Sequence, residues 1–223
     1  MGRLKDQTEA RNGDVAGHIV RWGVAQALFP HERESGDRYV VQPCAGGLLL
    51  AAVDGTGHGT EAAAAATMAV ATLRSFADES PIALVLRCHE ELKGTRGAVM
   101  TVVFLHLSNR TLTWLGVGNV EAVVCHAIGG KMTTVDRALL RAGVIGYQLP
   151  VLRSEMLPLN LHDTVILATD GVKPGFEDTL DLTRDPQSIA DDILARHGGG
   201  VDDALVLVAR YLGRDATESP ATV

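Results

Sequence analysis

The sequence is poor in the features that mark secreted, membrane-bound or nucleic-acid-binding proteins. It has only 3 cysteines among 223 residues, and none forms a CxxC pair. No apolar run reaches the roughly 20 residues of a membrane helix, and the N-terminus lacks the apolar core of a signal peptide. Acidic residues outnumber basic ones, 27 to 20, and no segment combines lysine and arginine with aromatic residues. We therefore expect a cytoplasmic protein with no membrane or nucleic-acid partner.

Known motifs of cysteine and nucleotide chemistry are also missing. Cys44, Cys88 and Cys125 match no disulfide or zinc pattern, so we expect small buried side chains rather than nucleophiles. Neither GxxxxGK[ST] nor GxGxxG after a strand occurs. The segment Gly55–Gly59 resembles a phosphate-binding loop only superficially, because it has no P-loop lysine.

The length and composition predict one domain. With 46% hydrophobic residues the chain can form one substantial core, and no linker interrupts it. We expect a single domain over residues 1–223, with its core at about 15–212. Small polar and charged residues gather in 1–14 and 213–223, which we expect to be frayed tails.

Short apolar runs separated by turn residues predict antiparallel strands. Three runs follow one another at 99–107, 111–117 and 120–127, and the last two are joined only by Gly118-Asn119. Connections this short are typical of hairpins, so we expect antiparallel pairing between neighbouring runs rather than parallel βαβ units.

Three segments predict helices, at residues 60–76, 81–92 and 186–196. The first is rich in alanine, with Thr60 as its expected N-cap and a face of small apolar residues that suits close packing on a sheet. Many antiparallel strands with a few helices covering them predict an α+β layered sandwich.

Acidic residues recur where a loop meets an apolar strand. The four junctions are Asp37, Asp54, Asp170 and Asp202. Asp54 ends the run 48–53 and is followed by a glycine-rich bend, and Asp170 ends the run 164–169 in the same way. A charge at the end of an apolar strand needs a partner, and neighbouring strand ends would place several carboxylates close together.

Clustered carboxylates suggest a hard divalent cation. Like charges repel unless a cation joins them, and oxygen ligands favour Mg²⁺ or Mn²⁺ over zinc. Two such ions about 3.5–4 Å apart can acidify a bridging water and orient the hydroxide for in-line attack on phosphorus, with no covalent nucleophile. A single Asp-Gly pair is usually only a turn, so this prediction depends on the whole set.

Six short motifs follow one another along residues 33–210. They are Ser35-Gly36-Asp37, Asp54-Gly55-Thr56-Gly57-His58-Gly59, Gly94-Thr95-Arg96-Gly97-Ala98-Val99-Met100-Thr101, Gly116-Val117-Gly118-Asn119, Ala168-Thr169-Asp170-Gly171-Val172 and Gly199-Gly200-Val201-Asp202-Asp203. In this order they resemble the PPM (PP2C-like) metal-dependent serine/threonine phosphatases, and among these the short bacterial SpoIIE-type and stressosome enzymes. The resemblance implies two antiparallel β-sheets packed face to face and flanked by helices.

The resemblance also implies the site residues. Asp54 would bridge two Mn²⁺ or Mg²⁺ ions, the Gly55 carbonyl would bind the second ion, and Asp37, Asp170 and Asp202 would complete the ligand set. The expected catalytic residues are Asp54, Asp170 and Asp202. Asp203 follows the ligand position and would orient the turn rather than bind metal.

The chain departs from the family pattern at several positions. Thr56 replaces a histidine that can protonate the leaving group in larger members, and His58, two residues on, is either that acid or a structural residue beside the turn. Asn119 replaces an aspartate that can bind a third metal, so a third ion is not implied. The N-terminal arginine that clamps phosphate in the animal enzymes has no clear counterpart. Arg96 either touches substrate or is only solvated.

The implied function is a phosphoprotein phosphatase that hydrolyses phosphoserine or phosphothreonine through a metal-bridged hydroxide. The glycine-rich loop after Asp54 and the segment Leu139–Gly146 favour phosphorylated STAS-domain proteins of a stressosome, RsbS- or RsbR-like, as substrates and partners. A phosphorylated anti-sigma-factor antagonist, as for RsbU- or SpoIIE-like enzymes, is the alternative. Two alternatives from other functional classes are a hydrolase of small phosphate esters and a catalytically inactive binding module.

Overall fold

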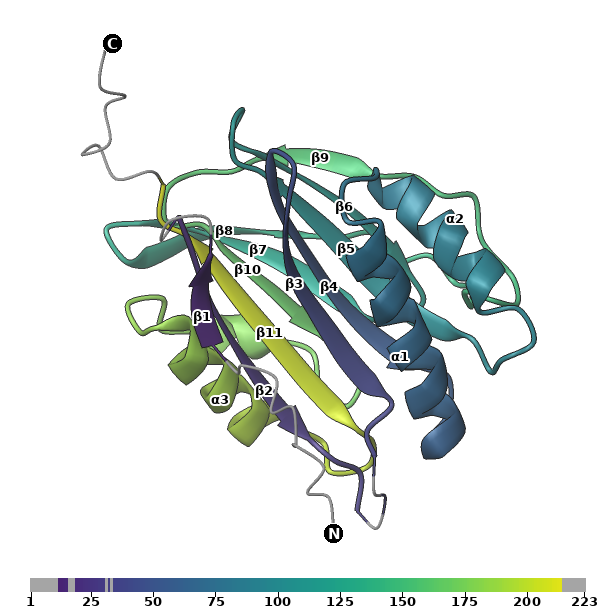
Figure 1. The fold of residues 1–223 in the computed structure, drawn as a ribbon. Coiled ribbons are helices and arrows are strands. Elements are labelled where there is room, and N and C mark those ends of the chain that lie inside the picture. The colour runs from purple at the N-terminus through teal and green to yellow at the C-terminus, as the bar shows by residue number, and fades with distance from the viewer. Residues whose placement is uncertain (1–11, 16–18, 31, 33, 214–223) are drawn as a thin grey trace, which may run out of the picture.

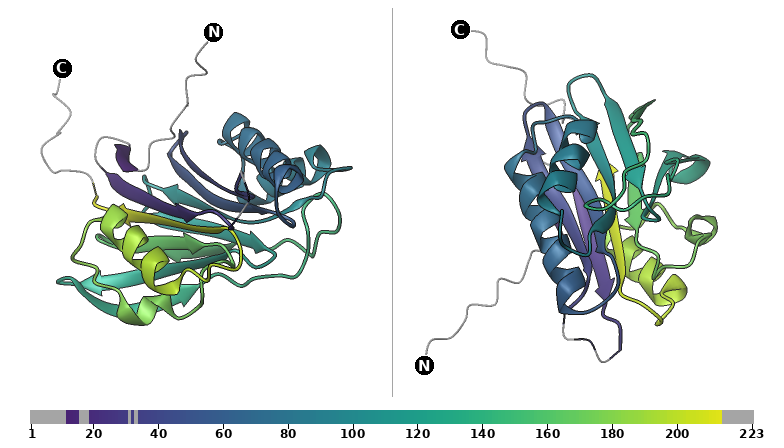
Figure 2. Two further views of the ribbon diagram at one scale, coloured as in Figure 1. Left: turned by 90° about the horizontal axis from the view of Figure 1, so that it is seen from below. Right: turned by 90° about the vertical axis from the view of Figure 1, so that its right-hand side faces the viewer.

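The computed structural model describes residues 12–15, 19–30, 32 and 34–213. In these ranges two antiparallel sheets pack face to face, and helices cover their outer faces (Figure 1). Turning the molecule by 90° shows the layers in sequence, with α1 and α2 on one side and α3 on the other (Figure 2). The predicted α+β sandwich of two flanked sheets is confirmed.

The first sheet has six strands in the order β1-β2-β11-β10-β7-β8. Their bounds are β1 Asn12–Val15, β2 Val20–Ala27, β7 Glu121–Ile128, β8 Lys131–Arg137, β10 Thr164–Ala168 and β11 Ala204–Tyr211. The second sheet has five strands in the order β3-β4-β5-β6-β9. Their bounds are β3 Asp37–Cys44, β4 Gly47–Gly55, β5 Ala98–His106, β6 Thr111–Val117 and β9 Glu155–Pro158.

The position of β4 explains its uninterrupted apolar run. Leu48, Leu50 and Ala52 point into the core between the two sheets. The alternate residues Leu49, Ala51 and Val53 belong to the layer that packs against the helices. Successive side chains of a strand point to opposite faces, so a strand buried on both faces has no polar position until it ends. Asp54 is the first residue of β4 that is not fully buried, at the point where the strand leaves the core.

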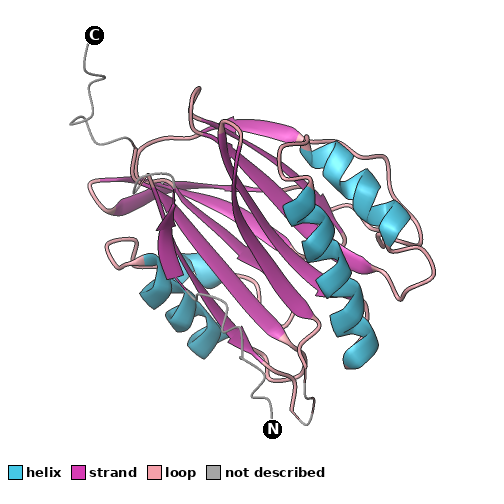
Figure 3. Cartoon of the chain, in the orientation of Figure 1, coloured by secondary structure: helices cyan, strands magenta, loops and turns pink. Residues whose placement is uncertain are grey.

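The three helices lie on the outer faces of the sheets (Figure 3), with α1 at Thr60–Ser75, α2 at Pro81–Glu91 and α3 at Pro186–His197. The alanine face of α1 is buried against the five-stranded sheet, as predicted. The predicted N-cap is wrong. Gly59, with φ of 79°, precedes the first helical residue Thr60, and no side chain caps this end.

One predicted hairpin is also wrong. β5 pairs with β6 and β7 pairs with β8, both antiparallel as expected, but β6 and β7 belong to different sheets. The three-residue connection Gly118–Val120 therefore crosses from one sheet to the other. Gly118 has φ of 93°, and an added Cβ would lie 2.2 Å from a methyl of Val99, so only glycine fits there. Loop length alone does not distinguish such a crossing from a hairpin.

The remaining structural expectations concern the ends of the chain and the cysteines. Residues 12–14, expected in a frayed tail, belong to β1 and pair with β2, while 1–11 and 214–223 lie outside the described residues. Cys88 and Cys125 are buried as expected, and burial raises the pKa of each thiol to about 12, which keeps both protonated. The expectation is wrong for Cys44, which is only half-buried because it ends β3 at the turn to β4. Trp22 and Trp114 belong to the core. None of the described helices is long and apolar enough to cross a membrane.

Candidate functional site

The predicted carboxylates come together at one end of the sandwich, with contributions from both sheets. Asp37 and Asp54 lie directly opposite each other in the β3–β4 pair of the five-stranded sheet. Asp170 follows β10, and Asp202 precedes β11, in the six-stranded sheet. Asp170 and Asp202 both raise the pKa of Asp54 through their charge, so the two sheets present these side chains to one another. We call Asp37, Asp54, Asp170 and Asp202 the carboxylate cluster.

Asp203 fixes the chain that leads into β3. It is 4% exposed, and its two carboxylate oxygens accept hydrogen bonds from the backbone N–H of Gly36 (2.6 Å) and of Phe29 (2.8 Å). These bonds join the two sheets, because Asp203 precedes β11 while Gly36 precedes β3. Asp203 therefore orients the loop next to Asp37, whereas the sequence predicted that it orients its own turn.

Thr169 holds Asp37 in place, a role that the sequence did not reveal. Its hydroxyl donates to Asp37 Oδ2 (2.6 Å) and accepts from the backbone N–H of Leu205 (2.8 Å). Thr169 and Asp37 are each 1% exposed. The available signal was a polar residue at the end of a buried strand, where its hydroxyl needs partners. Thr169 thus links β10, β11 and β3 beneath the carboxylate cluster.

Replacing Thr169 by valine, which keeps the shape, is expected to destabilise the protein. The change leaves a buried backbone N–H without its acceptor and removes a donor from a buried carboxylate. Each loss of this kind costs about 1–3 kcal/mol, so we expect the free energy of unfolding to fall by at least about 2 kcal/mol. Urea unfolding of both proteins measures the difference. Thr67→Val is the control, since that hydroxyl bonds only a carbonyl of its own helix (2.7 Å). Equal stability of Thr169→Val and the native protein would contradict the assigned role.

Two further contacts orient Asp170 and Asp202. Asn119 Nδ2 donates to Asp170 Oδ2 (2.8 Å). The connection between β6 and β7 thus contacts a carboxylate of the cluster. Asp202 Oδ1 accepts from the backbone N–H of Asp203 (2.8 Å). The departure from the family pattern at position 119 therefore places an amide donor where a further carboxylate would add negative charge.

The carboxylates raise one another's pKa. The pKa of Asp54 is raised to about 7, first by burial and then by the charges of Asp170, Asp202 and Asp203. Burial also raises the pKa of Asp37 well above its ordinary value, with Asp54 the largest neighbouring charge. The pKa of Asp170 is raised by burial and by Asp202, against a lowering hydrogen bond from Asn119. This mutual repulsion is what a bound cation would relieve.

The donor chemistry fits Mg²⁺ or Mn²⁺. All four members of the cluster offer carboxylate oxygens, which hard cations prefer. Across the described ranges, no group of three or more Asp, Glu, His or Cys side chains is arranged so that it could hold an ion by itself. Mg²⁺ usually keeps several waters and uses only one or two carboxylates, so a closed set of protein ligands is not required. The ligand roles of the cluster and of the Gly55 carbonyl stay predictions.

The raised pKa of Asp54 predicts a pH-dependent stability in the absence of divalent cations. An unfolded aspartate titrates near 3.9, and Asp54 in the folded protein titrates at about 7, so between these values the folded state holds an extra proton. The contribution of Asp54 to the free energy of unfolding is therefore largest below pH 3.9. It falls by at most about 4 kcal/mol as the pH rises to 7.

Asp54→Asn removes this dependence. In EDTA we expect the variant to melt at a higher temperature than the native protein at pH 8, and by a smaller margin at pH 5, where only about 1.5 kcal/mol of the contribution has been lost. Thermal unfolding of both proteins at the two pH values measures this. A difference in melting temperature that does not change with pH would show that Asp54 titrates normally.

The remaining candidates lie around the bend that follows Asp54. His58 Nδ1 is 2.8 Å from Glu32 Oε1, and its ring lies 6.1 Å from that of Phe29. These contacts give His58 partners outside the cluster, which supports a structural role rather than that of a general acid. Arg96 is exposed and its Nε donates to Glu61.

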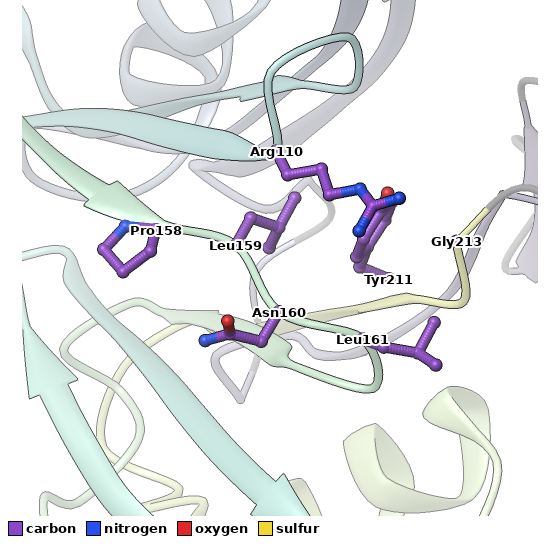
Figure 4. A pocket seen from close by; sticks show the side chains of 7 residues that line it. All are labelled: Arg110, Pro158, Leu159, Asn160, Leu161, Tyr211 and Gly213. Carbon is purple, nitrogen blue, oxygen red and sulfur yellow. The ribbon is translucent and has the colours of Figure 1, made fainter.

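One cavity lies apart from the carboxylate cluster. It has a volume of about 340 Å³ and is lined by Arg110, Pro158, Leu159, Asn160, Leu161, Tyr211 and Gly213 (Figure 4). Arg110 belongs to the β5–β6 turn, Pro158 ends β9, and residues 159–161 lie in the connection from β9 to β10. None of the cluster residues lines this cavity, so it is not part of the candidate site.

Comparisons with known proteins identify the family of this chain. A family model, Stage II sporulation protein E (SpoIIE), matches residues 45–212. "Phosphoserine phosphatase RsbX" of Bacillus subtilis (strain 168) is 26% identical over 96 residues, which span 43% of this chain and 48% of that protein. The match thus covers about half the length of this curated relative.

Two solved structures share the fold over most of the chain. A chain from a study of the bacterial stressosome as a modular system that controls secondary messenger signaling has a TM-score of 0.77 and 28% identity, covering 86% of this chain and 99% of that chain. RsbX in complex with magnesium has a TM-score of 0.79 and 19% identity, covering 90% and 99%. Together with the family match, they show that the chain belongs to the SpoIIE family of PP2C-like phosphatase domains.

Proposed function

We propose that this protein is a Mn²⁺- or Mg²⁺-dependent phosphatase that removes phosphate from phosphoserine or phosphothreonine of a protein substrate. The observation that carries the proposal is the carboxylate cluster, formed by both sheets, in which Asp54 has its pKa raised to about 7 by burial and by neighbouring carboxylates. A protein that did not bind cations would gain little from keeping such a destabilising arrangement. The family match and the magnesium complex of RsbX support the same activity.

Each residue of the site has a distinct task in this proposal. Asp37, Asp54, Asp170 and Asp202, with the carbonyl of Gly55, would hold the two ions. When bound, the ions would neutralise the carboxylates, polarise the phosphate ester and make a water acidic enough to attack phosphorus at neutral pH. Thr169 and Asp203 keep the strand ends in register, and Asn119 keeps Asp170 turned into the site.

We further propose that the substrates are phosphorylated STAS-domain proteins of a stressosome, of the RsbS or RsbR kind, and that the activity is cytoplasmic. The relative RsbX is named a phosphoserine phosphatase, and a similar solved chain comes from work on the bacterial stressosome. The resemblance of the segment Leu139–Gly146 and of the bend after Asp54 to stressosome phosphatases supports this substrate class, and an anti-sigma-factor antagonist stays the alternative.

Phosphate release from defined substrates tests the proposal. With Mn²⁺ the protein is expected to dephosphorylate a phosphoserine STAS protein with a kcat/KM about 100-fold or more above that for p-nitrophenyl phosphate, because the protein surface adds binding energy. EDTA should abolish both reactions, and added Mn²⁺ should restore them. Equal kcat/KM for the two substrates would instead indicate a hydrolase of small phosphate esters. No release from either would indicate an inactive binding module.

A further inference from the structure

Arg96 lies against the bend that follows Asp54. The backbone N–H of Thr56 donates to the carbonyl of Gly97 (3.0 Å), which joins the α2–β5 loop to this bend. At Gly57, where φ is 91°, an added Cβ would lie 2.8 Å from a terminal nitrogen of Arg96. A larger residue at position 57 would meet the guanidinium. The glycine therefore leaves room for Arg96 to lie over the loop that carries Asp54.

The backbone around Arg96 is held on both sides. The hydroxyl of Thr95 donates to the carbonyl of Leu92 (2.7 Å) and accepts from the backbone N–H of Gly97 (3.0 Å). The backbone N–H of Thr95 also donates to the Leu92 carbonyl (3.0 Å). The long side chain thus extends from a fixed point, which lowers the entropic cost of placing its head group on a ligand.

The partner of Arg96 is easily exchanged. Its Nε donates to Oε2 of Glu61 in the first turn of α1, and the two side chains are 51% and 68% exposed. Exposed ion pairs contribute little to stability because water and salt screen them. A phosphate monoester offers more charge than one carboxylate, and a planar guanidinium can bind two of its oxygens at once. A phosphate can therefore displace Glu61.

The surroundings leave the guanidinium accessible. A groove of about 410 Å³ runs between α1 and the α2–β5 loop, with Ala64, Ala65 and Met68 on one side and Gly94–Arg96 on the other. Glu61 also lines this groove. The side chain of Arg96 can thus change direction without displacing a packed neighbour.

From this arrangement we propose that Arg96 binds a phosphoryl oxygen of the substrate, and that Glu61 occupies its guanidinium while the site is empty. The inference rests on the phosphatase function proposed above and adds a specificity-determining residue to it. The carboxylate cluster offers only acceptors, and phosphate oxygens are acceptors as well, so a donor beside the cluster would add to the binding that the ions supply. Arg96 is such a donor, in the α2–β5 loop that is bonded to the bend after Asp54.

Steady-state kinetics of Arg96→Gln and Arg96→Lys test the role. We expect Arg96→Gln to raise KM about 10-fold for a phosphoserine protein and for p-nitrophenyl phosphate alike, to change kcat less than threefold, and to weaken inhibition by inorganic phosphate by a similar factor. Arg96→Lys should recover part of the affinity. Arg87→Gln is the matched control. Arg87, in α2, makes a similar ion pair with Glu79, which follows the C-terminal end of α1, so its replacement should leave KM unchanged.

A double-mutant cycle with Glu61→Gln separates direct binding from a general effect of charge. We expect Glu61→Gln to lower KM about threefold in the native background and to have no effect in the Arg96→Gln background. An equal effect in both backgrounds would overturn the role of Glu61, and a rise in KM for the protein substrate alone would overturn phosphate recognition by Arg96. If the native protein shows no phosphatase activity at all, the proposed function is refuted instead.

Discussion

Asp54→Asn is expected to lower kcat about 1,000-fold or more while the fold is kept. Asp54 has the central position in the cluster, opposite Asp37 in the strand pair and within reach of the charges of Asp170 and Asp202. Asparagine has nearly the same shape but carries no charge, so it removes the ligand that would join the two ions. Phosphate release from a phosphoserine protein with saturating Mn²⁺ measures the change.

The control for this prediction is Asp178→Asn. Asp178 is an exposed carboxylate of the 3₁₀ helix Phe176–Thr179, outside the carboxylate cluster, and its loss should leave kcat unchanged. Circular dichroism and thermal unfolding show whether both variants are folded. A folded Asp54→Asn protein with more than a tenth of the native kcat would contradict the bridging role.

Gly171→Ala is expected to produce the largest loss of stability. An added Cβ at Gly171 would lie 1.9 Å from the backbone carbonyl oxygen of Asp203, a contact that no side-chain rotation can relieve. The strand ends that carry Asp170 and Asp202 must then move apart. Overpacking of this kind costs about 3 kcal/mol or more, which corresponds to a fall in melting temperature of about 6–12 °C for a chain of this length.

Gly199→Ala provides the comparison within the same loop region. There the nearest backbone atom to an added Cβ is the Gly171 carbonyl oxygen at 3.3 Å, so a small shift suffices. We expect its melting temperature to fall by at most about 3 °C, corresponding to about 1 kcal/mol. Differential scanning calorimetry of the two variants tests the argument. Similar melting temperatures for both variants would show that the close approach at Gly171 does not hold the site together.

The fold was predictable where local patterns decide it. The run 48–53 has no polar residue because β4 is buried on both faces, and the small-residue face of α1 allows its backbone to approach Gly55 so closely that an added Cβ there would lie 2.1 Å from the Ala62 carbonyl oxygen. These patterns identify strands, helices and the sandwich class. The separation of β6 and β7 into different sheets was not predictable, because Gly118-Asn119 has the length and composition of a hairpin turn and nothing local shows that it crosses between sheets.

The site was predictable as a set of acidic strand ends but not as a network. Asp37 and Asp54 were identified from their positions next to apolar runs. The contacts that place them depend on residues distant in the sequence: Thr169 reaches Asp37 across 132 positions, and Asp203 reaches Gly36 across 167. Such partners are selected by tertiary packing, which leaves no periodic pattern along the chain.

Titration of the metal-free protein with Mn²⁺, followed by calorimetry, tests the central claim most directly because it does not depend on substrate or turnover. If the carboxylate cluster holds the ions, the native protein should bind two Mn²⁺ per chain, and Asp54→Asn should bind at least 10-fold more weakly at both sites. Equal Mn²⁺ affinity in the native protein and Asp54→Asn, or no heat of binding in either, would contradict the assignment of these carboxylates as a metal centre.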